Sequence, residues 1–130
     1  MMLKKCMLLL ATGLLSAAAQ AASVAFIEPL DGATLPTVFA VKFAVDGMQI
    51  KPAGELSADS GHHHLIVNGG AVAAGDTVPF DEQHIHFGKG QTEATVMLKP
   101  GIYTLTLQFA NGAHQSYGAA MSKTITVIVK

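Results

Sequence analysis

The chain has 130 residues, of which 50% are hydrophobic and 13% are charged, which is enough material for one small domain. A second independently folding domain is therefore excluded. All eight basic residues are lysines, and they face nine acidic residues, so the formal net charge is −1. A chain with neither arginine nor net positive charge lacks the basic patch needed to bind nucleic acid or an anionic membrane surface.

Residues 1–21 have the pattern of a secretory signal peptide. Two lysines precede an apolar run over residues 7–15, and Ala19 and Ala21 supply the small residues of a cleavage site. An uncleaved membrane anchor is the competing interpretation, but the run is much shorter than the ~20 apolar residues that span a bilayer. We therefore expect a single domain, residues 22–130, that is periplasmic or secreted and is not inserted in a membrane after cleavage.

The only cysteine of the chain, Cys6, lies within this leader and before its apolar run. It is therefore not placed to be the lipid acceptor of a bacterial lipoprotein. Cleavage also leaves a body without a disulfide, which fits a soluble periplasmic protein.

From residue 22 onward, apolar and polar residues alternate with the period of half-buried strands, and turn residues interrupt them at short intervals. In chain order the candidate strands are 24–28, 39–45, 63–67, 71–78, 85–87, 94–98, 103–109 and 125–129. About seven short strands in a domain of this size predict an all-β fold, an immunoglobulin-like antiparallel β-sandwich.

Two segments with little alternation, 48–61 and 111–120, are predicted to be long loops, where binding residues are commonly carried. Tyr103 follows a Pro-Gly turn at the start of a late strand. It is either a tyrosine-corner residue, whose hydroxyl bonds nearby backbone, or a core aromatic with an exposed tip.

Histidines carry the chemical signal. Five of the six lie in two short groups, HHH at 62–64 and HIH at 84–86. On a strand, residues i and i+2 share a face and lie about 6 to 7 Å apart, so the two imidazoles of each H-x-H pair can converge on one metal ion. Neutral imidazole suits copper, zinc and nickel, and no cysteine competes.

We therefore predict a transition-metal site, copper before zinc, with His62, His64, His84 and His86 as ligands and His63 and His114 in support. His64 and His86 are expected to belong to one site, although 22 positions separate them. Met48 and Met121 are either thioether ligands for Cu(I) or core fillers.

Binding, delivery or sequestration of the ion is favoured over catalysis, and no residue is assigned a catalytic role. Two alternatives stay open. In the first, the histidines form a hydrogen-bonded network that organises a surface for an envelope protein partner. In the second, the chain is a small redox or hydrolytic metalloenzyme. Clustered histidines also repel one another when protonated, which would make this region sensitive to pH.

Several motifs together resemble a family of small exported bacterial proteins that is classed only as a domain of unknown function. They are FIEPLDGA at 26–33, PAG at 52–54, GHHHL at 61–65, HIHFGKGQTE at 84–93 and KPGIYTLTL at 99–107, followed by the late His114. The resemblance implies a secreted domain whose shared histidines are His62, His63, His64, His84, His86 and His114, and it implies no activity.

A weaker likeness, limited to HIHFG at 84–88, is to copper/zinc superoxide dismutase, another sandwich with an H-x-H pair before an aromatic residue and glycine. The cysteine pair of that enzyme and its substrate-guiding arginine have no counterpart here. Periplasmic copper carriers of small sandwich fold are similar in architecture, and architecture alone does not establish function.

We predict that the mature chain begins at Ala22, because Ala19 and Ala21 provide the small side chains that signal peptidase accepts. Mass spectrometry of the exported protein tests this directly. An intact mass that retains residues 1–21 would contradict the prediction.

Overall fold

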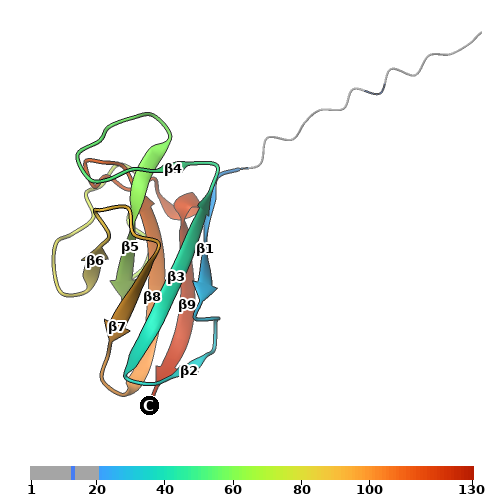
Figure 1. Cartoon of the computed structure of the whole chain (residues 1–130), viewed down its shortest axis with the longest axis vertical. Helices are drawn as coiled ribbons and strands as arrows, with labels where there is room; N and C mark the ends of the chain where they lie inside the picture. Colours follow the sequence, from blue (N-terminus) through green and yellow to red (C-terminus); the bar gives the residue numbers. More distant parts are fainter. Residues whose placement is uncertain (1–12, 14–20) are drawn as a thin grey trace, which may run out of the picture.

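The computed structural model describes residue 13 and residues 21–130. Its strands form two β-sheets that pack face to face (Figure 1). The predicted all-β sandwich is confirmed, whereas most of the predicted signal peptide lies outside the described residues. The strands are β1 (Ser23–Glu28), β2 (Thr34–Leu35), β3 (Val38–Asp46), β4 (Gln49–Ile50), β5 (Ser60–Val67), β6 (His84–His86), β7 (Glu93–Met97), β8 (Gly101–Ala110) and β9 (Ser122–Val129), with one 3-10 turn, η1 (Ala119–Met121). None of the described helical segments is long and apolar enough to cross a membrane.

The two sheets differ in width. The smaller sheet has three strands in the order β1-β3-β7, and the larger has the order β2-β9-β8-β5-β4, with β6 paired to β5 as well. Most pairs are antiparallel; the short β2 and β4 run parallel to β9 and β5. The smaller sheet therefore covers only part of the larger one.

Strict alternation along β3 and β8 builds the core between the sheets. Phe39, Val41 and Phe43 of β3 are buried, and their neighbours in the strand are exposed. Leu105 and Leu107 of β8 are fully buried on the opposing face. Every second side chain of each strand therefore points into the sandwich, as the sequence predicts.

One predicted strand is wrong. Residues 71–78 form no strand, and Thr77 makes only an isolated bridge to Gln115. The segment belongs instead to the long β5–β6 loop, in which Val78 alone is buried. Its alternation comes largely from alanines, which bury too little apolar area to hold a strand against a sheet. The predicted loop 48–61 is mostly correct, although β4 and the start of β5 lie within it.

Tyr103 is a tyrosine corner. Its hydroxyl donates a 2.7 Å hydrogen bond to the carbonyl oxygen of Lys99, four residues upstream, and its ring packs against the core. The bond fixes the turn that leads from β7 into β8. Of the two interpretations of this residue, the structure supports the corner.

The larger sheet is also buried on its outer face, away from the smaller sheet. Two loops, 68–83 and 111–118, cross this face and bond to each other, since Gly75 N–H donates to Ser116 O and Val78 N–H donates to His114 O. Ile66 and Gln108, which point outward from β5 and β8, are fully buried beneath them. The fold therefore has a second interior, lined by polar as well as apolar side chains.

Replacing Leu105 by alanine should lower the free energy of unfolding by about 2 to 5 kcal/mol, because the side chain is fully buried between the sheets. Ile102→Ala is the matched control: its side chain is 73% exposed on the same strand, so a change within about 0.5 kcal/mol is expected. Denaturant titration measures both. Equal losses for the two variants would show that the strand phase is wrong.

Candidate metal centre

Four histidines from three separate parts of the chain converge beneath the two loops. One ring nitrogen of each lies within 4.8 Å of the others, and the four residues are His62, His64, His86 and His114. This is the sole group of at least three His, Cys, Asp or Glu side chains so placed in the part of the chain that the structure describes. We call it the histidine cluster.

Strand β5 supplies two members of the cluster. Leu65 and Val67 of this strand belong to the sandwich core, so the alternating His62 and His64 point to the opposite, loop-covered face. Gly61 makes this placement possible, because a Cβ atom there would collide with the carbonyl of Ala110 on β8. The two strands can approach closely just before the first histidine.

The third member comes from the edge strand β6. His86 lies directly opposite His64 in the antiparallel register, and the two ring centroids are 4.4 Å apart. The structure thus brings together His64 and His86, the pair that the sequence analysis assigns to one site. Pairing of β5 with β6 places these two side chains next to each other, although they are far apart in the sequence.

The fourth member, His114, comes from the loop after β8 and has a left-handed backbone with a φ of 61°. Asn111 holds this turn: its Oδ1 accepts the N–H groups of Ala113 and Gln115, each at 2.9 Å, and its backbone carbonyl accepts the N–H of His114 at 2.9 Å. A strained backbone that its surroundings enforce is a common feature of functional sites.

The ring nitrogens are spaced as metal ligands are. Nδ1 of His114 lies 3.0 Å from Nε2 of His62, 3.4 Å from Nδ1 of His86 and 3.5 Å from Nε2 of His64. Four nitrogens at metal–nitrogen distances of about 2.0 to 2.1 Å in tetrahedral geometry are about 3.3 Å from one another. The three distances to His114 Nδ1 are therefore close to those of a four-nitrogen site, and the remaining pairs lie within 4.8 Å.

The tautomer of His86 is fixed by the loop. Its Nε2 lies 2.8 Å from the carbonyl oxygen of Pro79, which can only accept, so Nε2 carries the proton. In the neutral ring, Nδ1 then presents a lone pair to the cluster. A backbone carbonyl that orients the far nitrogen of a histidine is a usual feature of metal ligands.

Burial favours the neutral form of three members of the cluster, His62, His64 and His114. It lowers the pKa of His62 to about 4, with repulsion from His114 and then His86 as smaller causes. It lowers the pKa of His64 to about 2, helped by repulsion from His62, His86 and His114. The pKa of His114 is also lowered, by burial first and then by His86. Neutral imidazole is the form that coordinates metals.

Phe80 covers the partly exposed side of the cluster. Its ring stacks on His86 with centroids 3.9 Å apart and meets His114 edge-on at 4.9 Å, while 69% of its own surface stays exposed. His62 and His64 on the inner side have no exposure. Phe80 is not among the residues predicted from the sequence, because a single aromatic after Pro79 carries no periodic signal.

Two of the predicted site residues lie outside the cluster. The Nδ1 of His84 pairs with Oδ1 of Asp81 at 2.6 Å, and this bond is the main cause of the lowered pKa of Asp81. His63 points into the sandwich core, where its ring packs 4.6 Å from Phe43 and 5.1 Å from Phe109. His114, assigned a supporting place from sequence, lies within the cluster instead.

Neither methionine singled out from the sequence is among the cluster residues. Met121 is buried in the sandwich core, and Met48 packs against that core. Both therefore act as core fillers. The donor set of the cluster consists of imidazole nitrogens alone.

A family model described as a domain of unknown function, DUF4399, matches residues 41–130. The chain belongs to this family. All four cluster histidines lie within the matched DUF4399 region, which supports the resemblance drawn from the sequence motifs. No curated protein and no solved structure matches the chain, so the comparisons lend no support to a likeness to copper/zinc superoxide dismutase or to copper carriers.

The metal-free protein should lose stability as the pH falls below about 6.5. Burial lowers the pKa of His62 and His63 to about 4 and that of His64 to about 2, from 6.5. Between about pH 6.5 and pH 4 the unfolded chain binds protons at these positions and the folded chain does not, which costs about 1.4 kcal/mol per pH unit for each histidine.

Chelator-treated protein, unfolded by denaturant at a series of pH values, provides the measurement. His63→Phe should reduce the slope of stability against pH, because phenylalanine fills the same core position with a ring that binds no proton in either state. Stability that is flat between pH 6.5 and pH 4.5 would contradict the burial of these imidazoles in the folded state.

Proposed function

We propose that the protein binds a transition-metal ion, copper before zinc, through His62, His64, His86 and His114. The observation that carries this proposal is the meeting of their ring nitrogens around Nδ1 of His114 at 3.0, 3.4 and 3.5 Å. One cation at their centre would satisfy all four lone pairs at once.

Hydrogen bonding alone serves this arrangement poorly. Nδ1 of His114 can hold one proton and donate it along one of its three short contacts, while Nδ1 of His86 is a lone pair. The far nitrogens, Nδ1 of His62 and of His64, are buried without a partner among the described residues. Without an ion, the cluster nitrogens that receive no proton from His114 Nδ1 also remain unpaired. Each unpaired buried nitrogen costs about 1 to 3 kcal/mol.

The choice of metal follows from the donor set. Four neutral imidazoles suit both copper and zinc, and divalent copper binds a given nitrogen site more tightly than divalent zinc does. Binding, delivery or sequestration is the proposed activity, in the periplasm or outside the cell. The nitrogen-only donor set and the burial of His62 and His64 support binding over catalysis.

A hydrogen-bonded histidine network that organises a surface for an envelope protein is the second candidate. The bonds of His86 to Pro79 and of His84 to Asp81 favour it, because each pairs one histidine with a separate partner. The exposed Phe80 would then be part of that surface. Metal titration separates the two candidates.

Untagged protein titrated with Cu(II), Zn(II) and, under reducing conditions, Cu(I) should bind at least one ion at neutral pH. His64→Ala and His86→Ala should each weaken binding at least about tenfold, or about 1.4 kcal/mol. The double variant should lose much less than the sum, because the two side chains would hold the same ion. Isothermal titration calorimetry measures all four proteins.

His84→Ala is the matched control, since His84 lies on the same strand as His86 but outside the cluster. Its affinity should stay within about threefold of the unchanged protein, a difference of less than 1 kcal/mol. Failure of the unchanged protein to bind any of the three ions would overturn the metal proposal in favour of the network.

A further inference from the structure

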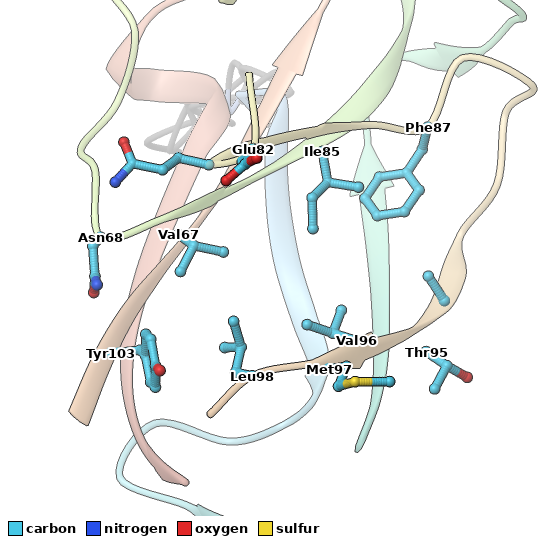
Figure 2. Close-up of a pocket in the computed structure, with 12 residues that line it drawn as sticks. Val67, Asn68, Glu82, Ile85, Phe87, Thr95, Val96, Met97, Leu98 and Tyr103 are labelled. Carbon is cyan, nitrogen blue, oxygen red and sulfur yellow. The ribbon is translucent and has the colours of Figure 1, made fainter. Parts of the chain in front are cut away.

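A groove with a volume of about 400 Å³ opens along the side of the sandwich, between β7 and β6 (Figure 2). Residues 94–98 all line it, in and just after β7. Because successive residues of a strand point to opposite faces, a cavity that touches five consecutive residues runs along the edge of that strand. The groove is thus a feature of the sheet edge.

Strand β7 ends the smaller sheet, and no other strand among residues 21–130 pairs with its outer edge. Its inner edge bonds to β3, since Leu98 N–H donates to Thr37 O and Phe43 N–H donates to Thr92 O. In an antiparallel ladder the bonded residues alternate, so the N–H and C=O groups of Thr95 and Met97 point away from β3. These backbone groups face the groove.

Apolar side chains line the interior of the groove. Val67 of β5, with Ile85 and Phe87 next to it, lies on one side, and Val96 and Leu98 lie on the other (Figure 2). Ile85 alternates with His84 and His86, so the groove and the histidine cluster lie on opposite faces of β6. The inner face of β5 and β6 extends past β7, and Ile85 on it is only partly buried.

The edge of β7 lacks the usual protection against pairing. Natural edge strands are commonly blunted by lysine, proline, bulges or extreme shortness. Strand β7 has five residues without lysine or proline, and Met97 on it is 77% exposed. The other sheet edges differ, since β2 and β4 have two residues each and β1 has a register shift between Phe26 and Glu28.

We propose that this groove binds an extended peptide segment of another protein, which adds to β7 as the fourth strand of the smaller sheet. Strand addition of this kind takes affinity from backbone hydrogen bonds and specificity from pockets for alternate side chains. The volume lies within the range of about 300 to 1,000 Å³ that is usual for binding pockets. Alternate apolar side chains of the peptide enter the groove.

Charge defines the chemistry of the partner further. Glu82 is the one charged residue that lines the groove, and the polar lining residues are Asn68, Gln83 and Thr95. The segment that fits is therefore one in which apolar residues alternate and a lysine or arginine stands beside them.

Selection from a displayed library of random heptapeptides on the full-length exported protein tests the proposal. Enriched sequences should alternate apolar residues and contain lysine or arginine. A synthetic peptide of that sequence should bind at least about tenfold more weakly when the amides that face β7 are N-methylated, and equally well when the alternate amides are. This control needs no change to the protein.

On the protein side, Thr95→Pro removes an N–H that faces the groove but takes no part in the β3 ladder. It should weaken peptide binding at least about tenfold, whereas Thr95→Val should not. Ala94→Leu, which fills the groove, should also abolish binding. Circular dichroism checks that each variant is folded.

Three results would overturn the proposal. The library could yield no enriched sequence, or the enriched peptide could bind equally well with either set of amides methylated. Alternatively, the protein could dimerise in sedimentation analysis and return to a monomer on Thr95→Pro, which would make a second copy of the chain the occupant. None of these measurements involves a metal, so they are independent of the proposed function.

Discussion

Four imidazole nitrogens held within 4.8 Å of one another are the constraint around which the outer face of the larger sheet is arranged. Lone pairs and ring dipoles at that separation repel one another unless a proton or a cation lies between them. The surrounding structure must hold the rings in place against this repulsion. His62 and His64 lie on β5, which pairs along its length with β8. His86 is held on β6 by its register with His64.

The position of the fourth histidine, His114, depends on a close approach between two loops. Gly112, two residues before His114, lies so close to Glu55 that a Cβ atom there would collide with its backbone carbonyl. The loop 111–118 is therefore pressed against the segment that leads into β5. This contact and the Asn111 turn place a loop histidine beside two strand histidines, a position that β8 alone would not give it.

Much of the fold follows from alternation, because period-two burial is a local property of the sequence. The same rule separates His62 and His64 from His63, whose ring packs against Phe43 and Phe109 in the core and not at the predicted site. It fails for residues 71–78, where small alanines mimic a strand pattern without its buried area. Local sequence therefore identifies strands best where their inward side chains are large.

Membership of the site is less predictable, because it depends on contacts between distant segments. The H-x-H pair at 84–86 is symmetrical in sequence, yet Asp81 bonds one histidine and Pro79 orients the other toward the cluster. His114 has no partner at i+2 to mark it. Since His62 and His64 are fully buried while His86 and His114 are partly exposed, the cluster meets solvent on the side of β6 and the loops. Strand β5 thus supplies the two inner histidines, and segments near the surface supply the other two beside Phe80.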